Sequence, residues 1–553
     1  MDSPNSNHEI LRDNDYLANG DTGINGVAED IHYLIISELA KVSTSAVFAL
    51  AQSSRALRRS ALPFAYRHLT LRKGSNMSKI QQAYQLLVEE FRNDTDSLVA
   101  KHVRELTIKE GLPADDLKLI FNQISQHGTL RKLNWETSAH MPKEVLEKIQ
   151  LVWPDLELSV RVLNRQNAST VPHRQMDINL LASPLLVKLV YTIYNQGYSA
   201  EQPSRSEWPK LTQALVSGGS VKYLHIECQT DGNAYIGMKI LDDREPLTFA
   251  RLDITPETRL PQLLELKLNI QRYWGQSNYL WDAEHCSLLR NAMDWSLLRK
   301  LDFGTDNPTG FFSAFTGWMP NLKALRFGVT EGLMGPAQNF IHSLESLESL
   351  DIARAQISIN TLWPAIMRHK DTLKELILRP ATSDYCYPQY IDIRILKTVT
   401  KDFPSLERLG WDAPVQSNID RKHSALLCTL NLKKLDLFLH LPQSASEYSD
   451  ELRQNAGGTI APPPLNRGNT EKAALSLMEK ISQAQEEPLE WLTLHLARTG
   501  FQDRAQPYLM QAKLQLRRSK DVKSDSDPKY EYRGNAQWNG LSSIEDVLAL
   551  EAE

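Results

Sequence analysis

Apolar and polar positions repeat along most of this chain in a leucine phrase of the form L-x-x-L-x-apolar. Strict copies include "SLLRKLDF", "MPNLKALRF" and "FPSLERLGW", and "HVRELTI" is a looser one. The leucine in the middle of each phrase serves as a reference position. The reference leucines are Leu106, Leu133, Leu158, Leu189, Leu224, Leu266, Leu301, Leu325, Leu350, Leu376, Leu409, Leu435 and Leu492. Their recurrence indicates a repeating structural unit.

Each repeat predicts one strand and one helix. The last two apolar positions of the phrase alternate with polar ones, as in a strand with one buried face. Segments between phrases, such as 338–346 and 393–403, carry apolar residues every three or four positions, as in a helix with one buried side. Reference leucines from Leu301 to Leu376 are 24 to 26 residues apart, within the range of about 20 to 29 typical of leucine-rich repeats.

We therefore predict an α/β fold in which the repeats stack into a solenoid over residues 72–510. Parallel strands would line its concave side and helices its convex side. An unrelated α/β fold with scattered amphipathic elements is the alternative interpretation.

Several segments interrupt the repeat. Residues 200–210 and 228–260 are polar or irregular and are expected to be insertions. The segment 441–470 is rich in Gly, Pro, Asn and Ser and predicts a mobile loop. A helix over 471–485 would then resume the array.

The last residues, 511–553, predict a C-terminal cap. The segments 512–520 and 529–538 alternate in polarity and predict a hairpin. Residues 542–553 begin with a helix-capping pattern and predict a short acidic helix.

A different pattern precedes the repeat. Residues 1–26 are polar and are expected to be a disordered tail, and residues 27–71 predict three short helices. One face of the first helix carries Ile31, Leu34, Ile35 and Leu39. The second, capped by Ser43 or Thr44, has Val47, Leu50 and Ala51 on its buried side. The third begins near Arg55 with Leu57 inward and ends or bends by Pro63.

This helical module resembles an F-box, in the form found in fungal proteins where an F-box precedes leucine-rich repeats. The matching residues of the ending phrase P-x-x-Y-R-x-L-x-L are Pro63, Tyr66, Arg67, Leu69 and Leu71. The apolar frame is matched by Ile31, Ile35, Leu39, Val47, Leu50 and Leu57. At its start the module departs from the family, because Val27-Ala28 replaces the usual Leu-Pro.

The resemblance implies the substrate-recognition subunit of an SCF-type (cullin-RING) ubiquitin ligase. The F-box would dock on a Skp-family adaptor, which joins it to a cullin scaffold, and the solenoid would hold an unknown protein substrate. Such a protein is not itself an enzyme. The adaptor-binding residues implied are Ile31, Ile35, Leu39, Val47, Leu50, Leu57, Leu62, Pro63 and Tyr66.

Three alternatives remain open at this point. The helical module is a simple cap over the first repeat, or the chain is a leucine-rich-repeat scaffold that needs no adaptor. The third and weakest alternative is an enzyme with an unrecognised site around 228–260.

The strand residues that alternate with the buried leucines point to a second candidate surface, the concave one. The expected target-binding residues are Asp302, Arg326, Asp351, Arg379, Asp412, Asp436 and Phe438. Mixed charges with an occasional apolar side chain suit a protein or peptide better than a nucleic-acid backbone. An ordinary solvated face is the alternative.

Composition narrows the remaining classes. A net charge of −5 over 553 residues does not favour nucleic-acid binding. The four cysteines form no C-x-x-C pair and are expected to be buried free thiols, as in a cytoplasmic or nuclear protein. No segment is long and apolar enough to predict a membrane span.

No nucleotide-binding, zinc-binding or nucleophile motif occurs, so no catalytic, metal or cofactor site is expected. The scattered histidines are expected on the surface or on strands: His140, His173, His225, His285 and His342.

Overall fold

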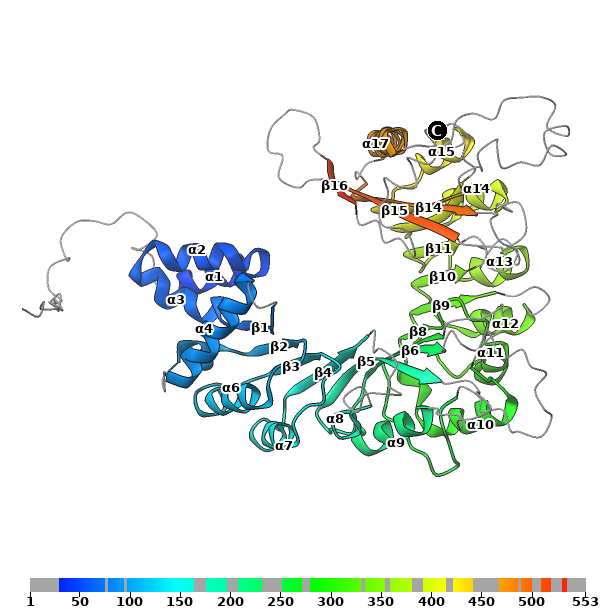
Figure 1. Ribbon diagram of the computed structural model, residues 1–553. Coiled ribbons are helices and arrows are strands. Elements are labelled where there is room, and N and C mark those ends of the chain that lie inside the picture. The colour runs from blue at the N-terminus through cyan, green and yellow to red at the C-terminus, as the bar shows by residue number, and fades with distance from the viewer. Residues whose placement is uncertain are drawn as a thin grey trace, which may run out of the picture. The chain divides into compact units, whose positions relative to one another are not determined.

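A computed structural model (Figure 1) shows two compact units, residues 1–161 and residues 162–553. Described residues are 29–74, 78–93, 97–163, 176–195, 207–230, 251–270, 279–329, 334–353, 359–379, 391–413, 421–440, 467–485, 489–499, 509–518 and 530–534. The expected tail over 1–26 and the acidic helix over 542–553 lie outside these ranges, as does most of the loop expected at 441–470.

The first unit begins with three helices and continues with alternating strands and helices. Its helices are α1 (Glu29–Val42), α2 (Thr44–Ser53), α3 (Arg55–Ala65), α4 (Lys79–Asn93), α5 (Leu98–His102), α6 (Ala114–His127) and α7 (Lys143–Val152). Its strands are β1 (His68–Arg72), β2 (Glu105–Lys109), β3 (Lys132–Glu136) and β4 (Glu157–Val162). The four strands pair in sequence order and in parallel.

The three-helix module has its own small core. The buried side chains are Ile36, Val47, Ala51, Ala61, Phe64 and Ala65, with Leu39, Ala40 and Leu50 packed against them. Ser43 caps α2 and Ser54 caps α3, since each hydroxyl accepts a backbone N–H from the following helix. The three predicted helices and the Ser43 cap are therefore confirmed.

Of the two outcomes predicted for Pro63, an end or a bend of the third helix, the end is wrong. The helix continues to Ala65, and the amide of Tyr66 donates to the carbonyl of Leu62. Pro63 itself has no N–H to donate to the preceding turn, and the last turn of the helix is closed by the amide of Tyr66.

The second unit continues the alternation. Its strands are β5 (Leu186–Asn195), β6 (Tyr223–Thr230), β7 (Glu265–Ile270), β8 (Lys300–Asp302), β9 (Ala324–Gly328), β10 (Ser349–Ala353), β11 (Glu375–Arg379), β12 (Arg408–Ala413), β13 (Lys434–His440), β14 (Trp491–Thr499), β15 (Leu509–Arg518) and β16 (Tyr530–Gly534). Neighbours from β5 to β14 pair in parallel, whereas β15 is antiparallel to both β14 and β16. The predicted C-terminal hairpin is thereby confirmed.

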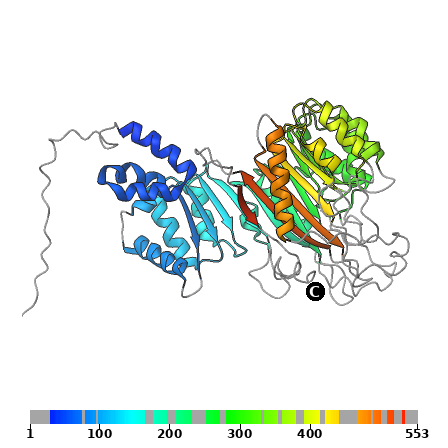
Figure 2. The same ribbon diagram turned by 90° about the horizontal axis from the view of Figure 1, so that it is seen from above.

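Helices connect these strands and gather on one face of them (Figures 1 and 2). They are α8 (Ile178–Leu181), α9 (Trp208–Gly218), α10 (Ala283–Ala292), α11 (Thr309–Phe315), α12 (Gly335–Ser343), α13 (Ile359–Met367), α14 (Ile393–Asp402), α15 (Arg421–Leu427) and α17 (Arg467–Ala484), and a short 3-10 turn spans Trp295–Leu297. Between strands and helices lies the core, which is rich in aromatic side chains: Trp295, Phe303, Phe311, Phe312, Phe315, Phe327 and Phe340.

The reference leucines lie opposite one another on neighbouring strands. In the first unit Leu106 pairs with Leu133, which pairs with Leu158. In the second, the aligned leucines are Leu189, Leu224, Leu266, Leu301, Leu325, Leu350, Leu376, Leu409, Leu435 and Leu492. Leu69 precedes them, opposite Leu106. Within each unit the predicted repeat is confirmed strand by strand.

Two boundaries differ from the prediction. Helix α9 begins at Trp208, inside the segment expected to be an insertion, with Pro209 in its first turn. Proline suits that position because its missing N–H would have no intrahelical partner there. Helix α17 begins at Arg467, so the expected loop ends earlier than residue 470.

Candidate functional site

The face of the strands opposite the reference leucines carries a row of charged residues in the second unit. Successive register partners are Lys267, Asp302, Arg326, Asp351, Ile377, Gly410 and Asp436. Two residues further along these strands, Asp412 pairs with Phe438, and Phe438 pairs with His495. Strand alternation puts all of these side chains on the same face, as the sequence predicted.

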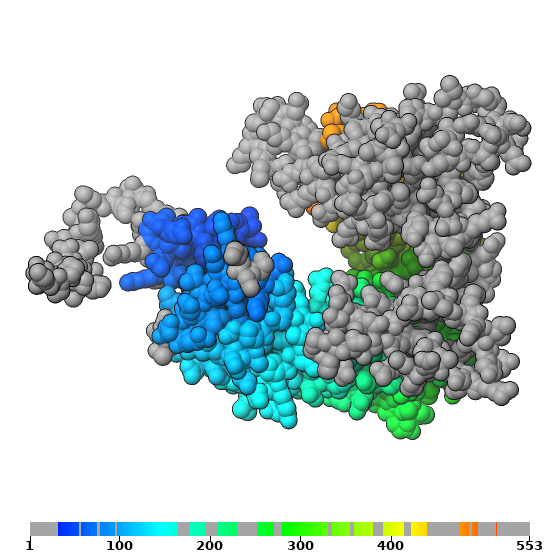
Figure 3. All heavy atoms as spheres, viewed as in Figure 1, coloured from blue at the N-terminus to red at the C-terminus, as the bar shows by residue number. Residues whose placement is uncertain are grey.

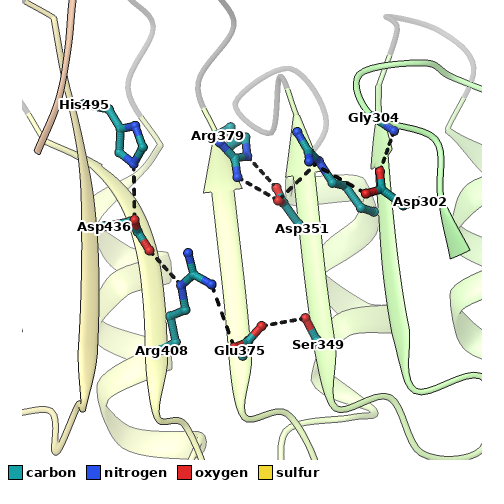
Figure 4. Close-up of polar contacts among 10 residues, drawn as sticks. Asp302, Gly304, Ser349, Asp351, Glu375, Arg379, Arg408, Asp436 and His495 are labelled. Carbon is teal, nitrogen blue, oxygen red and sulfur yellow. Dashed lines mark hydrogen bonds and ion pairs between the residues drawn. The ribbon is translucent and has the colours of Figure 1, made fainter. Parts of the chain in front are cut away.

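The aspartates of this row form ion pairs with arginine and lysine side chains from neighbouring strands (Figure 4). Arg379 donates two hydrogen bonds to the Asp351 carboxylate, at 2.8 and 2.9 Å. Arg326 Nε lies 3.4 Å from Oδ2 of the same Asp351. Asp302 lies 3.8 Å from both Arg326 and Lys267. Its Oδ1 also accepts the backbone N–H of Gly304 at 2.7 Å. Each carboxylate therefore bridges two cations.

Asp436 is the centre of a second set of contacts. It accepts from Arg408 Nε at 2.8 Å, and His495 Nε2 lies 3.2 Å from its Oδ1. The His495 ring stacks on Phe438 at a centroid distance of 4.7 Å, and the Arg379 guanidinium lies 5.4 Å from the same Phe438 ring. Phe438 thus joins the two sets. We call these residues the polar ladder: Lys267, Asp302, Arg326, Asp351, Arg379, Arg408, Asp436, Phe438 and His495.

The ladder buries its carboxylates and exposes part of its guanidinium groups. Side chains of Asp302, Asp351 and Asp436 are 8% to 11% exposed, against 29% to 32% for Arg326, Arg379 and Arg408. Burial raises the pKa of Asp436, but hydrogen bonds from His495 and Arg408 outweigh it and hold the pKa at about 2. Burial lowers the pKa of Arg379, but its hydrogen bonds to Asp351 and the charge of Asp351 raise it by more, so the pKa lies above its ordinary value. A ligand on this face meets guanidinium edges with fixed orientation.

Asp412 does not belong to the exposed surface, contrary to the prediction. Its side chain is fully buried, and its carboxylate accepts the backbone N–H of Ile391 at 3.1 Å. Burial raises its pKa to about 7, although the bond from Ile391 opposes the rise. Asp412 therefore ties Ile391, two residues before the start of α14, to β12, the strand that follows that helix.

Lys267, Arg408 and His495 are ladder members that the sequence prediction missed. His495 stands three residues after Leu492, as Arg379 and Phe438 stand after their own reference leucines. Extending the same count to β14 would have found it. Arg408 lies just before its reference leucine, and only the long reach of its side chain brings it to Asp436.

The three-helix module of the first unit presents an apolar surface. On α1, Ile31, Leu34 and Ile35 are 47%, 64% and 42% exposed, while the neighbouring Ile36 is 1% exposed. Tyr33, Val42 and Phe48 are also exposed on α1 and α2. Figure 3 shows side chains of this module, in blue, at the surface. We call Ile31, Leu34 and Ile35 the α1 stripe.

The residues implied for adaptor binding divide into three groups. Ile31 and Ile35 are exposed. Half-buried residues are Leu39, Leu50, Leu62, Pro63 and Tyr66. Val47 and Leu57 are buried inside the module and cannot contact a partner in this conformation.

Other side-chain chemistry is sparse within the described ranges. No group of three or more His, Cys, Asp or Glu side chains there is placed to hold a metal ion. Cys228 and Cys286 are buried free thiols, as expected, whereas Cys428 is free but only half-buried and Cys386 lies outside the described residues. Among the described helices, none combines the length and apolar character that crossing a membrane requires.

His285 differs from the expectation of a surface or strand residue. It is buried in α10, where its Nε2 lies 2.8 Å from the hydroxyl of Tyr279. Burial, together with the charge of Arg251, lowers its pKa to about 4. Its hydrogen bond and ring contacts place it in the core as a neutral packing residue.

The sequence was also compared with known proteins. No protein-family model matches it, and no curated protein matches it. Function is therefore inferred from residues and geometry.

Proposed function

We propose that this protein is the substrate-recognition subunit of an SCF-type ubiquitin ligase, with an F-box in residues 27–71 and leucine-rich repeats behind it. The observation that carries the proposal is the α1 stripe. Three large apolar side chains at helical spacing face outward from a module whose own core is complete without them.

Such a surface is favourable only when a partner covers it. Burying a side chain of this type contributes about 1.5 to 3 kcal/mol relative to leaving it exposed. An apolar helix-to-helix contact with a Skp-family adaptor would use this energy. The other half-buried residues at the module's end, such as Leu62 and Tyr66, would border the same contact.

The polar ladder is the proposed target-binding surface of the same protein. Arg326 and Arg408 each lie between two carboxylates, and Arg379 is held by two hydrogen bonds to Asp351, so the guanidinium groups are oriented before a ligand arrives. Oriented arginines favour bidentate bonds to carboxylates or to backbone carbonyl oxygens of a protein substrate. Ubiquitin transfer itself would be performed by the other subunits of the ligase.

Exposed residues of the α1 stripe provide the variants for testing adaptor binding. Ile31→Glu and Leu34→Glu change exposed residues and should leave the fold intact. Leu151→Glu is the matched control, because Leu151 on α7 is 82% exposed and lies outside the module. The purified chain is mixed with recombinant Skp-family adaptor and the amino-terminal part of a cullin, and complex formation is measured by gel filtration.

The wild type and the Leu151→Glu control are expected to bind adaptor, whereas the combined Ile31→Glu and Leu34→Glu variant is expected to lose binding. Absence of any complex with the folded wild type would remove the ligase proposal. The remaining candidate is then an adaptor-independent scaffold, which the polar ladder alone supports.

A further inference from the structure

Three arginines lie side by side immediately before the strands of the first unit. Arg67, Arg104 and Arg131 each stand two residues before an aligned leucine of β1, β2 and β3. The amide of Arg104 donates to the carbonyl of Arg67 at 2.9 Å, and the amide of Arg131 to that of Arg104 at 2.8 Å. Neighbouring strands are about 4.8 Å apart, so the three α-carbons span roughly 10 Å. We call them the arginine row.

Among the described residues, no acidic side chain pairs with the arginine row. Within the described residues, none of the three arginines forms an ion pair with an acidic side chain. Arg104 Nη1 donates instead to the carbonyls of Lys101 and Val103 at the end of α5. Arg67 and Arg131 are exposed. Burial lowers the pKa of Arg104, and the charges of Arg131 and Arg67 lower it further, so the three cations repel one another.

The same register position carries charges of alternating sign in the second unit. From β9 to β14 the residues two before each reference leucine alternate in sign: Lys323, Glu348, Lys374, Glu407, Lys433 and Glu490. Their ion pairs include Lys374 with Glu348 at 2.8 Å and Lys433 with Glu407 at 3.1 Å. The repeat therefore accommodates alternating charge at this position, and three like charges in a row are a property of this sequence rather than a demand of the backbone.

We propose that the arginine row binds an acidic helical segment of a partner protein. Residues four positions apart on a helix have Cβ atoms about 5 to 6 Å apart, close to the spacing of the strands. A helix with glutamates at that interval would place one carboxylate against each guanidinium. This contact needs neither the α1 stripe nor the polar ladder, so it goes beyond the proposed function.

A nucleic acid fits less well. Non-specific binding to a phosphate backbone typically draws on about six to ten cationic contacts, whereas the row supplies three. Carboxylates also border it, because Glu105 follows Arg104 directly and the exposed Glu157 neighbours Arg131 on the next strand. A phosphate backbone that continues past the row would meet these acids.

The test uses the full chain and a fluorescent alanine-based helical peptide with glutamates four positions apart. Arg67→Gln with Arg131→Gln forms the test variant, and Arg104 is kept because it caps α5. The control variant is Lys374→Gln with Lys433→Gln, at the same register position in the second unit. Anisotropy titrations are made at low and high salt, with a glutamine version of the peptide alongside.

The wild type is expected to bind the glutamate peptide better than the glutamine peptide, and high salt should weaken the binding. The test variant should lose about tenfold in affinity, and the control variant less than about twofold. Equal binding of both peptides, or unchanged affinity in the test variant, overturns the proposal. Binding of inorganic tripolyphosphate without binding of the glutamate peptide also overturns it. A variant that lacks the acidic residues 542–553 is titrated as well, and peptide binding seen only in that variant overturns the proposal of a partner protein.

Discussion

Arg379 and Asp351 form a bidentate ion pair across adjacent strands, with Nε to Oδ1 at 2.8 Å and Nη2 to Oδ2 at 2.9 Å. The planar guanidinium matches both carboxylate oxygens at once, which a lysine does not achieve. The pair is partly shielded from water and is also shared with Arg326. Among the ladder contacts described above, it is the one in which a guanidinium donates hydrogen bonds to both oxygens of a carboxylate.

The first prediction concerns this pair. In a double-mutant cycle of Arg379→Ala and Asp351→Ala, we expect a coupling energy of about 1 to 2 kcal/mol. Urea unfolding of the wild type, both single variants and the double variant measures it. Arg379→Lys is the matched control and should recover less than half of the loss, because it keeps the charge but not the fork. A coupling energy near zero would show that the pair is not formed in solution.

The second prediction concerns pH and Asp412. Its folded pKa of about 7 lies above the ordinary value of 3.8, so the folded state holds a proton that the unfolded state releases first. The resulting stability is fully present below pH 3.8 and is lost as the pH rises to about 7. Asp412→Asn keeps an oxygen acceptor for Ile391 and carries no charge. We expect it to exceed the wild type by roughly 1 to 3 kcal/mol at pH 8 and to match it near pH 4.

Chemical unfolding at several pH values provides the measurement for Asp412. Because the wild type alone should lose stability between pH 4 and 7 through this group, the difference between the two proteins is the informative quantity. If that difference is constant across the range, the carboxylate does not titrate as the burial implies.

The third prediction concerns Asp436, whose pKa is shifted in the opposite direction. Hydrogen bonds from His495 and Arg408 hold it at about 2, below its ordinary value of 3.8. This stability is present above pH 3.8 and is lost as the pH falls toward 2. Asp436→Asn should therefore be destabilised at pH 6 and approach the wild type in acid. Thermal unfolding followed from pH 6 downward tests this, and a deficit that persists unchanged in acid would argue against it.

The fourth prediction concerns Gly328 at the end of β9. A Cβ at this position would collide with the backbone carbonyl oxygen of Thr305, which cannot move without disturbing the turn after β8. Gly328→Ala is expected to cost about 2 kcal/mol or more. Gly335→Ala is the matched control, because a Cβ there meets no atom within 4 Å and Gly335 opens α12. Equal unfolding midpoints for the two variants would contradict the close approach.

The fifth prediction separates the two faces of α1. Ile36→Ala should destabilise the protein by about 2 to 5 kcal/mol, because Ile36 lies in the core of the three-helix module. Leu34→Ala, two residues away and exposed, should change stability by less than about 0.5 kcal/mol. Proteolysis of the amino-terminal region under native conditions reports the difference. A larger effect from Leu34 than from Ile36 would reverse the assignment of the two faces.

Much of the repeat was predictable because its information is local. A leucine phrase contains the alternation of a strand, and the segment after it contains the period of a helix. Stacking identical units then brings equivalent residues opposite one another, so counting from Leu301 and Leu325 predicts which residues share a register. The same counting found the face that carries Arg326, Asp351 and Asp436.

Local patterns did not reveal how deeply each residue is buried. Asp412 occupies an outward position by alternation, yet the chain around Ile391 covers it. On α1, the apolar face that the spacing suggested turns mostly outward, and Ile36 enters the core instead. Pro63 was expected to end or bend the third helix, yet α3 continues to Ala65. Pro209 lies in a segment expected to be an insertion, yet it occupies the first turn of α9, where proline is favoured.

By itself, the sequence determined the order of strands and helices, the leucine register and the alternation of faces. Only the tertiary structure decided which charged residues meet, which apolar residues remain exposed and where like charges line up without an acidic partner among the described residues. The physical reason is that periodicity depends on near neighbours in the chain. Burial and ion pairing depend on side chains that lie far apart in the chain and that folding brings together from neighbouring repeats.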